Sequence, residues 1–202
     1  MRRASRTHVD SVQNARSIHS SAPETSGAFL VSGRDGAAVP LDPLLRRAVL
    51  ATDGTVTNLI ESLLERVVIE KLGEEPAAAP LAEWPELAPG TQVLRRTVLI
   101  RGAESRRIFL HAESLVVLER LAPALRAELA ATDKPIGKLI REHRLESYRE
   151  IIASRSEPAG ARAVALGVDA SEPLVARTYR IHLGGRPAIQ ITERFLARDA
   201  TA

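Results

Sequence analysis

Residues 174–196 read LVARTYRIHLGGRPAIQITERFL, and this stretch decides the fold. Two runs rich in β-branched and aromatic residues flank a Gly-Gly pair, which is the pattern of a β-hairpin. Both strands have an apolar face, made of Val175, Tyr179, Ile181, Ile189, Ile191 and Phe195. A two-residue loop would put the two sets on opposite faces. We therefore predict a three-residue loop with Gly185 in a left-handed bulge, which brings them together.

The segments before this hairpin alternate between helical and strand patterns. Asp42-Pro43 is a helix-start signal, with the aspartate as N-cap and the proline at the first helical position. Helical patterns cover residues 44–50, 56–64, 123–132 and 138–142, and strand patterns cover 66–72, 92–101, 106–118 and 145–154. Residues 73–91 contain four prolines and are predicted to form a loop. The order predicts an α+β fold, with a six-stranded antiparallel sheet and helices on one face.

Composition sets the broad class of the chain. Its 202 residues suffice for one domain with a hydrophobic core. We expect residues 1–40, rich in Ser, Arg and Gly, to form a flexible tail, and residues 41–202 to form the domain. The net charge of +3 includes +2 from the tail, so the nearly neutral body argues against a nucleic-acid-binding surface. No apolar run reaches the roughly 20 residues of a membrane span, and we expect a cytoplasmic location.

Glu193 stands at an apolar position of the last strand, so its carboxylate is expected to point inward. A buried carboxylate needs a cationic or hydrogen-bond-donating partner, and the candidates are the strand residues Arg95, Arg96 and Arg177. Adjacent Arg95 and Arg96 must point to opposite faces. Apolar residues occur at both parities of their strand, so periodicity does not choose between them. The alternative interpretation of Glu193 is a structural carboxylate at the rim of the sheet.

Other catalytic chemistry has little support in the sequence. The chain has no cysteine, which excludes disulfides, thiolate metal sites and a cysteine nucleophile. Its histidines show no His-x-x-x-His pair, so no metal site is predicted. No serine lies in a nucleophile-elbow motif, and we interpret Glu113-Ser114 as a surface position on a strand.

Read in order, the body resembles the chorismate–pyruvate lyase family over about residues 42–197. The resemblance rests on LATDGTVT (50–57), VLRRTVLI (93–100), HAESL (111–115), KPIGKL (134–139), RTYRI (177–181), GGRP (184–187) and ITERFL (191–196). The order and spacing of these segments carry the resemblance, together with their agreement with the predicted strands.

The resemblance implies a lyase that converts chorismate to 4-hydroxybenzoate and pyruvate without a cofactor, in a pocket buried under helical flaps. It carries the family's key arginine onto Arg95 and its key acid onto Glu193, with pocket contacts from Val56 and Ile136. Well-studied members often have Met at the position of Val56 and Leu at that of Ile136, so the side-chain shape of the pocket differs here. The implied partner is a small-molecule substrate, and the sequence leaves monomer and dimer open.

Two other functions are compatible with the sequence. The first is a non-catalytic effector-binding domain, since sensor domains of some transcription regulators resemble this fold and share the Arg-x-Tyr-Arg hairpin. Such regulators carry a winged helix-turn-helix ahead of the sensor, and we expect the segment before the body to be too short for one. The second is a scaffold protein that docks through its tail. Turnover of chorismate to 4-hydroxybenzoate distinguishes the lyase from both.

Overall fold

Six strands form one antiparallel sheet in the computed structural model, which describes residues 36–197. The strands are β1 (Val67–Ala78), β2 (Gln92–Gly102), β3 (Ile108–Val116), β4 (Ser147–Pro158), β5 (Pro173–Leu183) and β6 (Arg186–Leu196), in the order β1-β2-β3-β6-β5-β4. The predicted six-stranded antiparallel sheet is therefore confirmed. β1 is longer than predicted and continues through Pro76 into the expected loop; the proline is tolerated because β1 is an edge strand.

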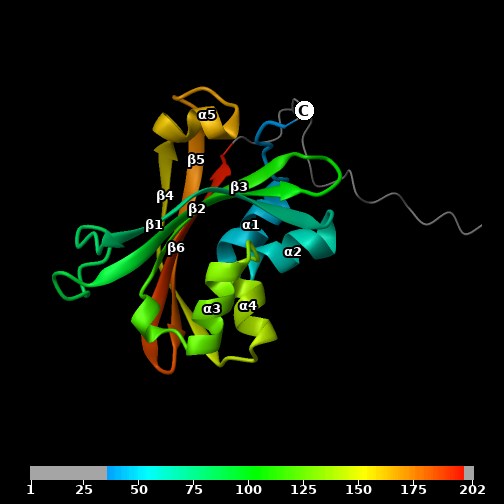
Figure 1. The fold of residues 1–202 in the computed structure, drawn as a ribbon. Helices are drawn as coiled ribbons and strands as arrows, with labels where there is room; N and C mark the ends of the chain where they lie inside the picture. The colour runs from blue at the N-terminus through cyan, green and yellow to red at the C-terminus, as the bar shows by residue number, and fades with distance from the viewer. Residues whose placement is uncertain (1–35, 198–202) are drawn as a thin grey trace, which may run out of the picture.

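Four helices cover one face of this sheet (Figure 1). They are α1 (Pro43–Ala51), α2 (Val56–Leu63), α3 (Pro123–Ala131) and α4 (Ile136–Glu142). α1 begins as predicted, because the carboxylate of Asp42 accepts hydrogen bonds from the N–H groups of Leu44 and Leu45. None of the helices described within residues 36–197 is long and apolar enough to cross a bilayer.

Among residues 36–197, segments that cover the opposite face of the sheet lie at its two ends. The short helix α5 (Ala163–Leu166) packs at one end against Leu99 and Leu196. At the other end, Trp84 from the β1–β2 connection packs against Leu115. Because both faces are partly buried, apolar side chains occur at both parities along the central strands.

Most of the predicted tail lies outside the described residues. Its last residues belong to the packed structure: Ala38 forms an isolated parallel bridge with Ile108, and Val39 is fully buried. The packed domain therefore includes residues before position 41.

The turn between β5 and β6 differs from the prediction. It contains two residues, Gly184 and Gly185, with φ values of 57° and 74°, so the predicted three-residue loop is wrong. The apolar faces still meet, since Ile181 pairs with Ile189 farther along the hairpin. Ala188 is the extra residue that makes this possible, because a bulge there shifts the register by one position.

Two further bulges lie on the edge strands, at Leu72 of β1 and Ile152 of β4. Each inserts one unpaired residue and reverses which residues face the helices from that point on. The bulge in β1 places Glu74 on the face covered by the helices, directly opposite Arg96. The bulge in β4 puts Arg149 on that face and Arg155 on the other.

Candidate functional site

A cavity lies between the sheet and the helices. The volume open to the centre of a water molecule is about 60 Å³, several times the roughly 10–15 Å³ that one water needs. Its polar lining consists of Thr55, Thr57, Arg96, Ser114, Arg149, Tyr179 and Glu193. The first residues of α2 and α4 cover it, and the predicted contacts Val56 and Ile136 both line it there.

Glu193 lies on the floor of this cavity with both carboxylate oxygens engaged. The residue is only 5% exposed, so the prediction of an inward carboxylate is confirmed. Oε2 accepts a hydrogen bond of 2.7 Å from Nη2 of Arg177, and Oε1 accepts one of 3.0 Å from the hydroxyl of Tyr179. Of the three arginines considered as partners, Arg177 is the one in contact. The buried charge is thus paired and hydrogen-bonded, as its burial requires.

Arg177 also connects the sheet to the end of α1. Its Nη1 donates to the carbonyl oxygen of Val49 and, at 2.8 Å, to that of Thr52. A cation at a helix C-terminus interacts favourably with the exposed carbonyl groups. Burial, with a further contribution from the Glu193 carboxylate, raises the pKa of Tyr179 well above its usual range, so its hydroxyl remains a donor.

Arg96 approaches the same cavity from β2 and is 3% exposed. Its Nη1 donates to the carbonyl oxygen of Lys134 at 3.3 Å, and its Nε lies 3.3 Å from Oε2 of Glu74. Burial lowers the pKa of Arg96, against the opposing effect of Glu74 and Asp133. Within residues 36–197, its Nε and Nη2 lack a hydrogen-bond partner. Buried donors are normally satisfied, so this guanidinium is suited to binding an anionic group.

The structure does not bring Arg95 into the cavity. Its side chain is 30% exposed, lies 3.2 Å from Oε1 of Glu83 and lines a polar basin on the opposite face of the sheet. The expectation that Arg95 and Glu193 share a cavity is therefore wrong. Because consecutive residues alternate across a strand, Arg96 takes the position that was expected for Arg95.

A count of each parity separately would have indicated Arg96. On the face of Arg96, β2 carries the apolar residues Leu94, Val98 and Ile100, and Gln92 at its start is polar. Those on the face of Arg95 include two polar residues, Thr97 and Arg101, beside Val93 and Leu99. The more apolar face is the one that packs against the helices.

Ser114 and Arg149 are polar residues of the cavity for which no site role was predicted. Ser114, expected at the surface, is 6% exposed and lines the cavity from β3. Arg149 lines it from β4, donating through Nη2 to Oγ1 of Thr55 at 3.1 Å and through Nη1 to the carbonyl oxygen of Asp53 at 3.3 Å. No sequence pattern indicated Arg149, because β4 is largely exposed and its bulge interrupts the alternation.

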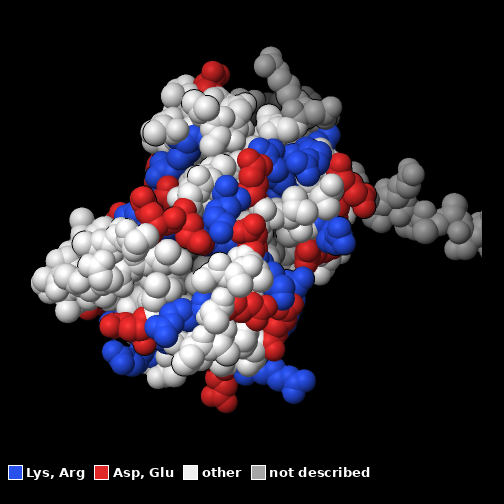
Figure 2. Space-filling view, in the orientation of Figure 1, with Lys and Arg blue, Asp and Glu red and all other residues white. Residues whose placement is uncertain are grey.

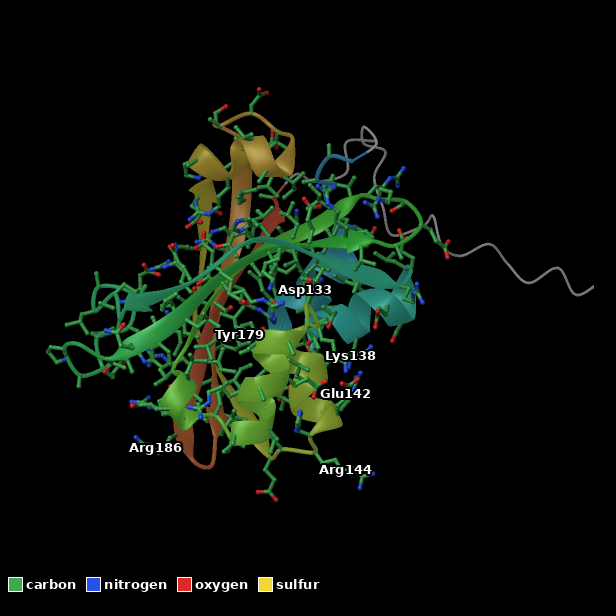
Figure 3. All side chains as sticks on the ribbon, in the orientation of Figure 1. Asp133, Lys138, Glu142, Arg144, Tyr179 and Arg186 are labelled. Atoms are coloured by element: carbon green, nitrogen blue, oxygen red, sulfur yellow. The ribbon has the colours of Figure 1, made fainter. Side chains whose placement is uncertain are left out.

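The exterior of the domain contrasts with this interior. On the face shown in Figure 2, acidic and basic side chains are interspersed. Figure 3 shows Tyr179 in the space between the sheet and the helices α3 and α4, whereas Lys138 and Glu142 of α4 point away from that space. We therefore expect the charged side chains that line the cavity, and not those at the surface, to determine which ligand binds.

The fold and the cavity together define an α+β domain with a cavity between its sheet and a helical cover, lined by two arginines and a buried carboxylate. Comparison with known proteins identifies the family. The chain belongs to the Rv2949c-like chorismate pyruvate-lyase family, whose model matches residues 50–200. The resemblance to chorismate–pyruvate lyases is thereby confirmed.

Relatives with lyase names agree with this assignment. The chain is 32% identical over 154 residues to a chorismate pyruvate-lyase of Mycobacterium leprae, covering 74% of this chain and 73% of the relative. It is 29% identical over 163 residues to a chorismate pyruvate-lyase of Mycobacterium tuberculosis, covering 76% and 82%. A putative lyase of Methanocaldococcus jannaschii, MJ0807, is 30% identical over 160 residues, covering 77% and 81%.

Solved structures of other proteins have the same fold. PhnF from Mycobacterium smegmatis matches with a TM-score of 0.57 at 16% identity, over 75% of this chain and 67% of PhnF. Its effector domain alone matches with a TM-score of 0.56 at 15% identity, over 72% of this chain and 90% of that domain. At this level of identity the likeness shows the fold alone.

Proposed function

We propose that this chain converts chorismate to 4-hydroxybenzoate and pyruvate. The observation that carries the proposal is a cavity in which the buried arginine Arg96 and the buried carboxylate Glu193 share one face of the sheet. Relatives named chorismate pyruvate-lyase support the same substrate. A cytoplasmic location is part of the proposal, since a chain without cysteine fits a reducing compartment.

The reaction needs no net oxidation or reduction. Chorismate is a cyclohexadiene with a ring carboxylate, a hydroxyl at C4 and an enolpyruvyl ether at C3. The C3–O bond breaks, the hydrogen on C4 moves to the CH2 of the enolpyruvyl group, and the ether oxygen becomes the keto oxygen of pyruvate. The ring becomes aromatic, which drives the reaction. Since the substrate accepts its own hydrogen, the protein can act mainly by holding the reactive conformer, which contributes several kcal/mol.

In this proposal Arg96 binds the ring carboxylate, because its planar guanidinium can donate to both carboxylate oxygens. Glu193 accepts a hydrogen bond from the C4 hydroxyl at the other end of the ring. A carboxylate has about four acceptor positions, so capacity remains beside the bonds from Arg177 and Tyr179. Those two bonds fix the carboxylate, which favours a positioning role over that of a base. Val56 and Ile136 contact the ring from the cover.

The test is turnover by the purified chain, with chorismate and isochorismate assayed side by side. We expect 4-hydroxybenzoate and pyruvate in equal amounts from chorismate. Arg96→Ala should lower kcat/KM by roughly 30-fold to 1000-fold, as expected when one partner of a buried charge pair is removed. Arg95→Ala is the matched control and should stay within about twofold, because Arg95 lies outside the cavity. No product from either substrate, or loss of activity in the Arg95 variant alone, would contradict the proposal.

A second candidate is a non-catalytic ligand-binding domain. It is favoured by the fold, which matches the ligand-binding domain of a putative GntR-family regulator from Bordetella bronchiseptica with a TM-score of 0.50 at 19% identity, over 66% of this chain and 85% of that domain. Tight binding of chorismate in calorimetry without any release of pyruvate would support this candidate over the lyase.

A further inference from the structure

We propose that Arg149 binds the carboxylate of the enolpyruvyl side chain, so that two arginines divide the two carboxylates of chorismate between them. This inference rests on the proposed function, because it takes chorismate as the substrate. It adds a specificity-determining residue at a position where neither the sequence pattern nor the family resemblance placed one.

Arg149 and Arg96 enter the cavity from its two sides. In the sheet, β4 is an edge strand and β2 lies four positions away from it. At about 4.8 Å per strand, the two backbones are roughly 19 Å apart. Both side chains nevertheless line the same cavity, so they reach toward each other across it. Glu193 and Tyr179, on β6 and β5, lie on the floor between them.

The guanidinium of Arg149 has donors that an anion can take over. Its two hydrogen bonds go to neutral oxygens, those of the Thr55 hydroxyl and the Asp53 carbonyl. Its Nε is buried and has no hydrogen-bond partner in the described part of the chain. A carboxylate can accept two parallel hydrogen bonds from a guanidinium and adds the attraction of opposite charges, which a neutral oxygen does not. A carboxylate is therefore favoured over the neutral acceptors that now hold this side chain.

The position of Arg149 also matches the substrate. The ether at C3 is adjacent to the C4 hydroxyl, so its carboxylate lies toward the Glu193 end of the cavity and not toward Arg96. Arg149 is close to that end: burial raises the pKa of Tyr179, and the charge of Arg149 is among the effects that oppose this rise. The ring carboxylate, on the far side of the ring from the hydroxyl, is left for Arg96.

This arrangement separates the two products. Once the C3–O bond breaks, the ring carboxylate belongs to 4-hydroxybenzoate on Arg96, and the side-chain carboxylate belongs to pyruvate on Arg149. Arg149 therefore contributes to the binding of chorismate but not to that of 4-hydroxybenzoate. A residue with only a structural role in the cover would affect both ligands alike.

The experiment compares the two ligands across three variants. KM for chorismate is measured by pyruvate release, and Kd for 4-hydroxybenzoate by isothermal titration calorimetry. Arg149→Ala should raise the chorismate KM by roughly 30-fold or more and leave the 4-hydroxybenzoate Kd within about twofold. Arg96→Ala should weaken both. Arg155→Ala is the matched control from the same strand; its side chain is 52% exposed, pairs with Glu157 and lies on the other face.

Two results would overturn the inference. A chorismate KM within about twofold of wild type shows that Arg149 makes no contact with the side chain. A parallel weakening of both ligands shows that it only holds the cover through Thr55. Should Arg149→Ala fail to fold, Arg149→Lys replaces it. Because lysine carries a point charge without the planar fork, the chorismate KM should rise by less than in Arg149→Ala, and the 4-hydroxybenzoate Kd should not change. If the wild type binds chorismate without turnover, the proposed lyase activity fails separately, and calorimetric Kd values for chorismate then test Arg149.

Discussion

The buried pair of Arg177 and Glu193 is expected to stabilise the whole domain, and Arg177→Met tests this. The substitution keeps an apolar chain of similar length but removes the donor to Glu193 and both bonds to the end of α1. Leaving a buried charge without its partner costs about 3–5 kcal/mol. Domains of this size are stable by only about 5–15 kcal/mol, so the loss is a large fraction of the total.

The assay is urea unfolding followed by fluorescence of the single tryptophan, Trp84, which is fully buried. With a slope of about 2 kcal/mol per molar urea, a loss of about 4 kcal/mol lowers the midpoint by about 2 M. Arg155→Met is the control, because an exposed ion pair contributes no more than about 1 kcal/mol.

A double-mutant cycle makes the reasoning refutable. Glu193→Gln alone removes the charge but keeps an acceptor, and is expected to cost about 1.5–3 kcal/mol. Combined with Arg177→Met, it should cost clearly less than the sum of the two, because the charge that lacked a partner is gone. Additive losses, or a loss below about 1 kcal/mol for Arg177→Met, would show that the two side chains do not form a coupled buried pair.

Three further predictions concern single residues. Burial lowers the pKa of His111 to about 4. Between pH 6.5 and pH 4 the imidazole is therefore protonated in the unfolded chain but neutral in the folded one. The free energy of unfolding should fall as the pH is lowered through this range. His111→Gln should remove up to about 3 kcal/mol of this loss, measured by urea unfolding at pH 7 and pH 4.5. Tyr179→Phe removes a donor to the buried carboxylate and should cost about 1.5–3 kcal/mol in the same assay. Gly137→Ala would place a Cβ 2.7 Å from Cγ2 of Thr55, pushing the starts of α2 and α4 apart; kcat/KM should fall by roughly tenfold with an unchanged circular dichroism spectrum, whereas Gly73→Ala, which meets open space, should keep full activity.

The order of the elements could be predicted from the sequence because local signals were strong. Asp42-Pro43 starts a helix wherever it precedes an apolar stripe, and the last hairpin combined strand patterns with a Gly-Gly pair. Glu193 could be placed inside for the same reason: its neighbours at the same parity are apolar on a strand with one clearly buried face.

Periodicity could not choose between Arg95 and Arg96 because their strand is packed on both sides, and the resemblance carried the key arginine onto Arg95, one residue away from the cavity position. Trp84 and α5 bury parts of the second face, which puts apolar residues at both parities and weakens the alternation. The bulges at Leu72 and Ile152 depend on pairing with neighbouring strands, which no local pattern records. The cavity position of Arg149 followed from one of them and could not be predicted.

The larger polar basin on the opposite face is not the better candidate for the substrate site, because its arginines are already paired with carboxylates. The basin on the opposite face, with about 470 Å³ open to the centre of a water molecule, contains more arginines than the cavity does. Each of these already has a carboxylate partner: Arg95 pairs with Glu83, Arg155 and Arg194 with Glu157, and Arg162 with Glu113. An anion entering there would have to displace a charge already present: even Nη1 of Arg194, which has no hydrogen-bond partner within residues 36–197, lies 3.1 Å from Oε2 of Glu113. In the cavity, Nε of Arg96 lies 3.3 Å from Glu74, but Nη2 of Arg96 and Nε of Arg149 are buried donors without a hydrogen-bond partner in the same range. Because a buried donor left unsatisfied costs about 1–3 kcal/mol, a ligand that satisfies it gains that energy on binding, and the smaller cavity is the one with such donors on both sides.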